Sequence, residues 1–159
     1  MKRTFNIIIG LAALMLAAVS CQKDDSAQKV LDPTVVGEWH LVAAKAEGVS
    51  ILKNVDIYLC IKEDSTFELY QKSGTQKHRY DLFTGTCHIE NGVLTGVYSD
   101  GQPWGGKYTY AKTIDGILLK TTNNIEVQKY RSCQIPEAVR ANANIIDTKS
   151  AFTAGSPIL

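Results

Sequence analysis

The sequence has 159 residues, a length typical of one domain, and its 45% hydrophobic and 21% charged residues are ordinary for a globular protein with a buried core. Without the first 20 residues, 15 basic side chains remain against 16 acidic ones, which gives a formal charge of −1. This balance excludes the basic surface that binds nucleic acid.

Residues 1–20 have the composition of an export signal. Lys2 and Arg3 form a basic start, and residues 7–18 form an apolar run that is too short for a membrane-spanning helix. Small residues then precede Cys21, and Leu16 stands five positions before it rather than three. The stretch resembles a bacterial lipoprotein signal, which implies cleavage before Cys21 and acylation of its thiol. The alternative is an ordinary secretory signal with an unmodified Cys21.

Residues 21–33 are predicted to form a polar tether that ends at Asp32-Pro33. Its segment Gln22-Lys23-Asp24-Asp25 resembles the surface-export signal of Bacteroidetes lipoproteins, and a plain solvated tether is the alternative. The resemblance implies a lipid-anchored protein on the outer membrane or the cell surface. Three acyl chains, each gaining about 0.8 kcal/mol per buried methylene, would supply the contact with the membrane.

Nine β-strands are predicted by alternating side chains, with turn signals at a spacing of about 12 residues. The clearest alternation lies at 55–62, and Asn91-Gly92 is the strongest hairpin signal. Closure would hide the edges of such a meander, so we expect an all-β antiparallel up-and-down barrel of eight to nine strands within residues 34–134. The expected strands are 36–46, 55–62, 66–71, 77–83, 85–90, 93–99, 106–112, 117–122 and 125–131, with a loop at 49–54.

The side chains expected inside this barrel are bulky, so a filled barrel is a second interpretation beside one with an open mouth. In the first strand, Gly37, Trp39, Leu41 and Ala43 share the inward face. The other residues expected inside are Ile57, Leu59, Phe67, Leu69, Leu94, Tyr108, Tyr110, Leu119 and Val127.

Three cysteines follow the acylation site, at positions 60, 87 and 133. An odd number in an oxidising compartment allows one disulfide and leaves one free thiol. Cys60 and Cys87 lie on different predicted faces, whereas Cys133 follows the last strand. We prefer a Cys87–Cys133 bridge, which would pin the C-terminal extension to the barrel, and three free thiols are the alternative.

Residues 135–159 form a C-terminal extension of different composition. A short helix is expected at 136–141, with Pro136 at its first position. Val139, with Ile135 or Ile145, is predicted to cover one barrel mouth. Beyond Asp147 we expect a mobile tail.

The tripeptide Gly37-Glu38-Trp39 at the start of the first strand resembles the G-x-W signature of lipocalins. Together with the export signal and residues 98–105, it makes residues 34–136 similar to the lipocalin-like lipoproteins of Bacteroidetes. The resemblance implies that Trp39 lies at the closed barrel end and that Arg131 packs across it, a cation–π contact of about 0.5–2 kcal/mol. The second lipocalin motif, a T-D-Y-like turn, is missing.

No catalytic constellation emerges from the sequence. Cys87 and His88 are neighbours on a strand and therefore point to opposite faces. His40, His78 and His88 are scattered, so we expect surface histidines and neither a metal nor a cofactor. The protein is therefore expected not to be an enzyme; a hydrolase or isomerase ranks third among its functions.

The expected function is the binding of a small hydrophobic or amphipathic molecule in the barrel mouth by a lipid-anchored lipocalin-like protein. The alternative is a non-enzymatic surface interaction or structural module with a filled barrel, whose protein partner the sequence does not name. Trp104, in a glycine-rich loop, is predicted to fasten this loop to the barrel wall, and the alternative places it on the rim of the mouth, where it could stack on a ligand. The candidate ligand-binding residues are Leu59, Phe67, Leu69, Tyr108, Tyr110 and Trp104.

Overall fold

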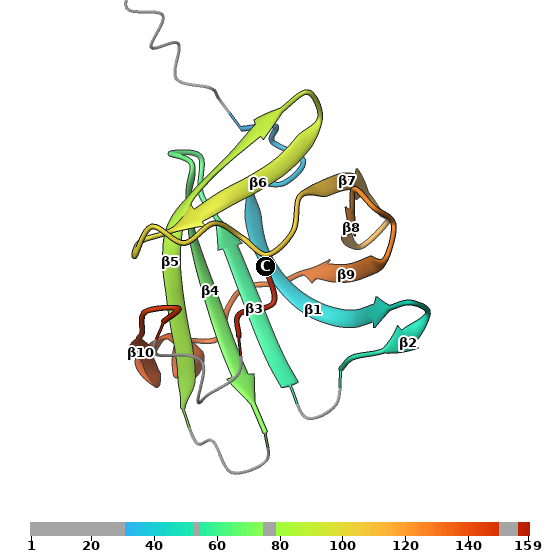
Figure 1. The fold of residues 1–159 in the computed structure, drawn as a ribbon. Coiled ribbons are helices and arrows are strands. Elements are labelled where there is room, and N and C mark those ends of the chain that lie inside the picture. The colour runs from blue at the N-terminus through green and yellow to red at the C-terminus, as the bar shows by residue number, and fades with distance from the viewer. Residues whose placement is uncertain (1–30, 53–54, 75–78, 150–155) are drawn as a thin grey trace, which may run out of the picture.

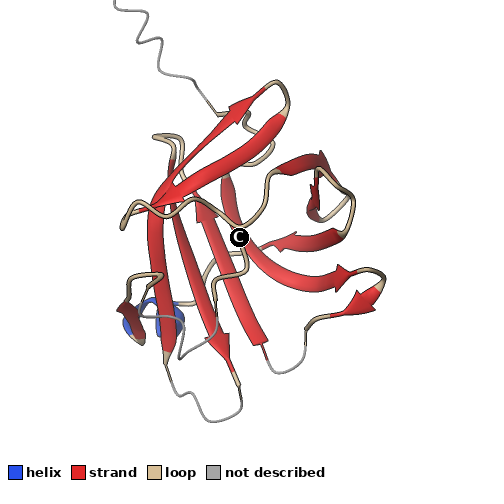
Figure 2. Cartoon of the chain, viewed as in Figure 1, coloured by secondary structure: helices blue, strands red, loops and turns tan. Residues whose placement is uncertain are grey.

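The predicted strands form one sheet in the computed structural model, which describes residues 31–52, 55–74, 79–149 and 156–159 (Figure 1). Strands make up nearly all of its regular structure, and one short helix follows the last barrel strand (Figure 2). The signal, the tether up to residue 30 and the acylation site Cys21 lie outside the described residues. The elements are β1 Gly37–Ala46, β2 Val49–Ser50, β3 Val55–Ile61, β4 Thr66–Ser73, β5 Tyr80–Glu90, β6 Val93–Tyr98, β7 Tyr108–Lys112, β8 Gly116–Thr121, β9 Glu126–Ser132, α1 Glu137–Ala141 and β10 Ala143–Ile145.

The sheet closes into an eight-stranded antiparallel barrel. Hydrogen-bonded neighbours follow the order β5-β4-β3-β1-β9-β8-β7-β6, and β5 also pairs with β6, which joins the two ends of the row. The short β2 forms a hairpin with β1, and β10 pairs in parallel with the first part of β5, so both lie outside the ring. The predicted all-β up-and-down barrel is confirmed.

The two strands predicted at 77–83 and 85–90 are one strand in the described residues. β5 runs unbroken through Gly85, which lies opposite Tyr98 of β6. A Cβ atom on Gly85 would lie 2.1 Å from the main-chain oxygen of Val97, so this glycine lets β6 approach instead of ending the strand. The first part of β5 thus pairs with β10 and the second part with β6.

A β-bulge in β1 changes which side chains of this strand enter the barrel. The register with β9 shifts between Leu41 and Ala43, so Ala44 is buried in the barrel core and Ala43 is not. The predicted inward position of Ala43 is therefore wrong. An extra residue in one strand of a pair produces this change of face, and single-strand alternation does not reveal it.

Trp39 closes one end of the barrel, as predicted. Its side chain is 8% exposed, and the indole Nε1 donates a 3.0 Å hydrogen bond to the main-chain oxygen of Val35. Gly37 has a φ of +146°, and a Cβ there would lie 3.1 Å from the Trp39 ring. Residues 31–36 cover this closed end, and Tyr110 holds them through a 2.9 Å hydrogen bond to the Asp32 carboxylate.

Arg131 does not pack across Trp39, so that prediction is wrong. In the β1–β9 pairing Ser132 lies opposite Trp39, and Arg131 lies opposite His40 on the outer face. The Arg131 side chain is 61% exposed, and its Nε lies 3.4 Å from the Asp115 carboxylate. The predicted inward position of Val127 in β9 is also wrong, because Gln128 and Tyr130 are buried while Val127 is half-buried.

Residues 135–145, the first part of the C-terminal extension, pack outside the barrel wall rather than over a mouth. Pro136 is the N-cap residue of α1 instead of its first helical residue. Val139 and Ile135 join a second apolar cluster on the outer face of β3, β4 and β5, whose other buried members are Cys60, Tyr70 and Tyr80. Ile145, in β10, is exposed. The predicted cover of the mouth by Val139, Ile135 or Ile145 is therefore wrong.

Candidate functional site

The end of the barrel opposite Trp39, where β1 finishes and β9 begins, is occupied by residues 156–159, here called the tail segment. Leu159 is 2% exposed and belongs to the same apolar cluster as the barrel interior. In Figure 1 the chain end lies inside the ring of strands. The prediction of a mobile tail beyond Asp147 is therefore wrong for residues 156–159. We call this end of the barrel the mouth.

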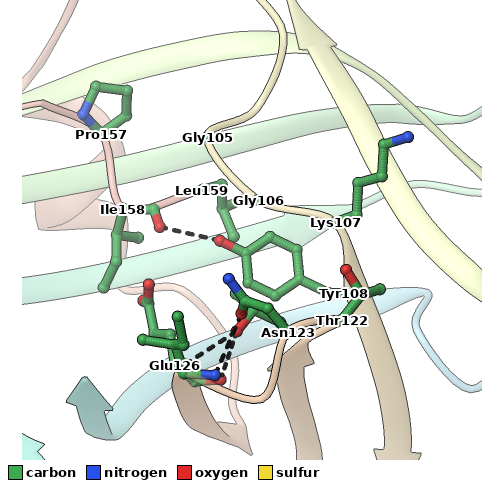
Figure 3. A pocket seen from close by; sticks show the side chains of 12 residues that line it. Gly105, Gly106, Lys107, Tyr108, Thr122, Asn123, Glu126, Pro157, Ile158 and Leu159 are labelled. Atoms are coloured by element: carbon green, nitrogen blue, oxygen red, sulfur yellow. Dashed lines mark hydrogen bonds between the residues drawn. The ribbon is translucent and has the colours of Figure 1, made fainter. Parts of the chain in front are cut away.

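Two tyrosines and one glutamine hold the inner part of the tail segment. The Tyr98 hydroxyl donates a 2.7 Å hydrogen bond to the main-chain oxygen of Leu159. The Tyr108 hydroxyl donates to the oxygen of Ile158 at 3.3 Å, and Gln128 Nε2 donates to the same oxygen at 3.2 Å (Figure 3 shows the Tyr108 bond). These donors come from β6, β7 and β9, so strands from one half of the barrel converge on one short segment.

Gln71, near the end of β4, binds the tail segment from the opposite side. Its Nε2 donates a 3.0 Å hydrogen bond to the oxygen of Ser156, and its Oε1 accepts a 3.1 Å hydrogen bond from the main-chain N–H of Ile158. Gln71 is 4% exposed and Gln128 is 0% exposed. A buried amide costs free energy unless it is hydrogen-bonded, so the tail segment satisfies groups that the barrel has placed in its interior.

Burial keeps the tyrosines of the mouth protonated. Desolvation, followed by interaction with Tyr108 and Asp100, raises the pKa of Tyr98 far above its ordinary value of 10.0. Burial, followed by the charge of Glu126, also raises the pKa of Tyr108, and its hydrogen bonding with Gln128 opposes the shift. Both phenols therefore act as neutral hydrogen-bond donors at physiological pH.

Two cavities flank the tail segment. One, of about 480 Å³, lies between it, residues 105–108 and the turn from β8 to β9 (Figure 3). The other, of about 280 Å³, lies on the side of Tyr98 and the loop at Gln102-Pro103. Figure 3 shows the Tyr108 ring directed toward Ile158, with Lys107 directed away. Rim residues of the larger cavity include Ile125, Glu126, Asn123 and Thr122.

The candidate ligand-binding residues do not form one site. Leu59, Phe67 and Leu69 are fully buried in the barrel core. Tyr108 lines the larger cavity at the mouth, whereas Tyr110 lies at the closed end with Asp32. Bulky side chains thus occupy the centre of the barrel, and two of the cavities that could take a small molecule lie beside the tail segment.

Trp104 fastens its loop to the barrel rather than standing on the rim. Its side chain is 5% exposed, with ring-centroid distances of 5.1 Å to Phe67 and 6.2 Å to Tyr108. Its indole Nε1 has no hydrogen-bond partner among the described residues. The prediction that Trp104 fastens the loop is therefore confirmed, and the alternative place on the rim is wrong.

Sequence reasoning missed Gln71, Gln128, Tyr98 and the tail segment itself. A signal for Gln71 was present, because it continues the inward series of Phe67 and Leu69 at a spacing of two. A polar residue at an inward position requires a partner, which makes it a candidate for binding. Gln128 was missed because the prediction placed its neighbour Val127 inside the barrel, which puts Gln128 on the outer face.

All three described cysteines are free thiols, so the preferred Cys87–Cys133 bridge is not formed. Cys87 lies in the barrel interior, whereas Cys133 contacts the outer cluster together with Cys60. The wall of the barrel therefore separates the two thiols. Burial, followed by the charge of Asp64, raises the pKa of Cys87 to about 12, so its thiol is protonated and unreactive.

Other polar groups lie on the outer face. His40 contacts the Asp56 carboxylate at 2.9 Å and stacks on Tyr58, while the Tyr80 hydroxyl donates to the same carboxylate. Within residues 31–52, 55–74, 79–149 and 156–159, no group of three or more His, Cys, Asp or Glu side chains could hold a metal ion. Helix α1, in that same part of the chain, has five residues, and no helix there has the length and apolarity needed to cross a membrane.

Comparisons with known proteins find similarity in structure only. No family model and no curated protein matches the sequence. A DUF4847 family protein from Bacteroides vulgatus ATCC 8482 is 11% identical with a TM-score of 0.44, over 65% of this chain and 96% of the other. The lipoprotein YedD from Klebsiella pneumoniae subsp. pneumoniae MGH 78578 is 12% identical with a TM-score of 0.44, over 81% of this chain and 92% of the other.

Proposed function

We propose that this protein is a lipid-anchored, non-enzymatic, lipocalin-like binding protein that holds one small hydrophobic or amphipathic molecule at the barrel mouth. The observation that carries the proposal is the cavity of about 480 Å³ beside the tail segment. Small-molecule sites are concave and occupy about 300–1,000 Å³, so the cavity has a suitable size.

The lining of this cavity suits an amphipathic ligand. Ile125 and Ile158 offer apolar surface, and Glu126 and Asn123 offer polar groups beside it. The half-exposed Ile125 and the exposed Val49 and Ile51 add apolar side chains to this end of the molecule. A molecule with an apolar body and a polar end would bury the first and keep the second in water.

Anchoring through Cys21 would leave the mouth accessible. Leu31 is buried in the barrel cluster, and its neighbour Asp32 bonds Tyr110 at the closed end, so the tether joins the barrel there. The ten residues from Cys21 to the first described residue span at most about 35 Å, which keeps the closed end near the lipid. We propose that the protein lies on the outer membrane or the cell surface of a bacterium such as a member of the Bacteroidetes, with its mouth pointing away from the bilayer.

Native mass spectrometry of the protein purified from the membrane of its host tests ligand binding. A retained small molecule is the expected result. Thr122→Trp should fill the cavity and release this molecule, because Thr122 is exposed on the lining. Ile114→Trp is the matched control, since Ile114 is fully exposed in a turn near the closed end. Equal ligand retention in both variants would place the ligand elsewhere.

A separate variant tests the anchor. Cys21→Ser should move the protein from the membrane fraction to the soluble fraction, because no thiol remains for acylation. The intact mass of the parent protein should exceed that of its residues 21–159 by the mass of the acyl groups. A parent protein without added mass would leave Cys21 as an ordinary cysteine.

A second candidate function rests on the filled barrel interior. Leu59, Leu69 and Leu94 are fully buried members of the core cluster, so bulky side chains occupy the centre of the barrel. The protein would then act through its outer surface as an interaction or structural module. Retention of a protein partner, and no small molecule, in the mass spectrometry experiment would favour this function.

A further inference from the structure

We propose that the mouth binds an extended peptide segment through its main chain, and that the tail segment is the protein's own competitor for this site. The inference rests on the proposed function, because it takes the mouth as the binding site. It adds the chemical class of the ligand, a peptide with an apolar side chain at the position that Leu159 occupies.

The hydrogen bonds to the tail segment indicate recognition of a main chain. Tyr98, Tyr108, Gln128 and Gln71 make five such bonds within the described residues, and every one ends on a main-chain oxygen or nitrogen of the segment. Contacts of this kind do not depend on the side chains of the bound segment. The same groups would therefore bind another extended peptide in the same position.

Gln71 presents its carboxamide to the segment as a neighbouring strand would present a peptide group. It donates to the oxygen of Ser156 and accepts from the N–H of Ile158, so both of its polar atoms pair with main chain that lies two residues apart. Peptide recognition by strand addition uses such main-chain bonds for affinity and side-chain pockets for specificity. Here the side-chain pocket is the space that Leu159 fills among the core residues of the barrel.

The burial of two amides distinguishes a peptide ligand from a purely apolar one. Gln71 and Gln128 are almost completely buried, and an unpaired buried amide is costly. An apolar molecule in the place of the tail segment would offer no partner for the five hydrogen bonds that these amides and the two phenols make to the segment. A peptide would replace each bond of the tail segment with an equivalent one, so the site favours an occupant rich in amide groups.

The test uses the full chain with Leu159→Asp, because a charged side chain in the apolar pocket should expel the tail segment. Isothermal titration calorimetry then measures binding of an N-acetylated and amidated Ser-Pro-Ile-Leu peptide. The variant should bind this peptide, and the parent should bind it at least about tenfold more weakly, because its own segment competes. Ile145→Asp is the matched control, since Ile145 is exposed, and it should behave like the parent.

A second substitution tests the role of the main-chain contacts. Adding Gln71→Leu to Leu159→Asp should weaken peptide binding by about tenfold, because two hydrogen bonds are lost. Binding of lauric acid, used as an amphipathic probe without amide groups, should not change. If Leu159→Asp does not give the circular dichroism spectrum of the folded parent, Ile158→Pro replaces it, since it removes the N–H that binds Gln71.

The outcomes separate this inference from the proposed function. The inference is supported if Leu159→Asp binds the peptide and the added Gln71→Leu substitution weakens this binding. Binding of lauric acid without binding of the peptide overturns it and leaves the proposed small-molecule function standing. A folded variant that does not bind the peptide overturns the inference, whereas the proposed function is contradicted only if the parent, whose tail segment lines the cavity, binds no small molecule. The inference is also overturned if Gln71→Leu leaves peptide binding unchanged, because the main-chain hydrogen bonds of Gln71 would then not contribute to peptide affinity.

Discussion

Tyr98 and Leu159 lie 61 residues apart in the sequence, and the Tyr98 hydroxyl donates a 2.7 Å hydrogen bond to the main-chain oxygen of Leu159. Both residues are buried, so this bond is shielded from water. It connects the end of β6 to the tail segment and fixes that segment in the barrel mouth. Its strength can be measured through substitutions on both sides of the bond.

Tyr98→Phe should lower the free energy of unfolding by about 1–3 kcal/mol, because it leaves the buried main-chain oxygen of Leu159 without this donor. Urea unfolding followed by circular dichroism provides the measurement. In the Leu159→Asp background, where the segment is expelled, the same substitution should cost much less. Additive effects of the two substitutions would show that the bond does not couple the two residues.

Trp39→Phe should destabilise the barrel more than Trp104→Phe does. Both indoles are buried, but Nε1 of Trp39 donates to Val35, whereas Nε1 of Trp104 has no partner among the described residues. The loss of volume is the same in both variants, so the difference reports the hydrogen bond, about 1 kcal/mol. Thermal or urea unfolding of the two variants side by side checks this. Equal destabilisation would show that the hydrogen bond from Trp39 to Val35 adds no stability at the closed end.

Arg140 fastens α1 to the barrel wall through two carboxylates. Its guanidinium lies 2.7 Å from Glu38 and 3.2 Å from Glu68, and it also donates to the Tyr70 hydroxyl. Arg140→Gln should cost about 1–2 kcal/mol of unfolding free energy, between the values typical of exposed and of buried ion pairs. Arg131→Gln is the matched control and should cost almost nothing, because Arg131 is exposed.

The effect of Arg140→Gln should depend on pH. Burial pushes the pKa of Glu68 upward, but hydrogen bonds from Lys62 and Tyr70 and the charges of Lys62 and Arg140 outweigh it, so the pKa falls below its ordinary value of 4.5. Ionised Glu68 therefore stabilises the folded state above this ordinary value, and the stabilisation is lost as the pH falls through the lowered pKa. The stability difference between parent and variant should be largest near neutral pH and shrink below about pH 4.5. A difference that stays constant with pH would contradict the ion-pair explanation.

The free thiols should differ in reactivity. Iodoacetamide should modify Cys133 before Cys87, because Cys133 is only partly buried, while Cys87 is buried and burial raises its pKa to about 12. Mass spectrometry of peptides from native and unfolded protein measures the order. A Cys87–Cys133 disulfide-linked peptide from protein isolated under non-reducing conditions would contradict the structure.

The local features of the barrel could be predicted from sequence because they depend on short-range chemistry. Alternation at 55–62 predicted β3 almost to its ends, and Asn91-Gly92 marked the turn between β5 and β6. The burial of Trp39 also followed from its place in an alternating strand. By contrast, β9 offers apolar residues in both of its phases, so alternation alone could not place Val127 outside and Gln128 inside.

The sequence by itself determined the all-β class, the meander of strands and the tryptophan of the closed end, because turn preferences and side-chain alternation act between near neighbours. Only the tertiary structure decided the bulge in β1, the separation of Cys87 from Cys133 and the place of the tail segment. These depend on strand register and on contacts such as that of Gln71 with Ile158, which are 87 residues apart. No local pattern encodes such a contact, because its stability comes from groups that meet only when the barrel has closed.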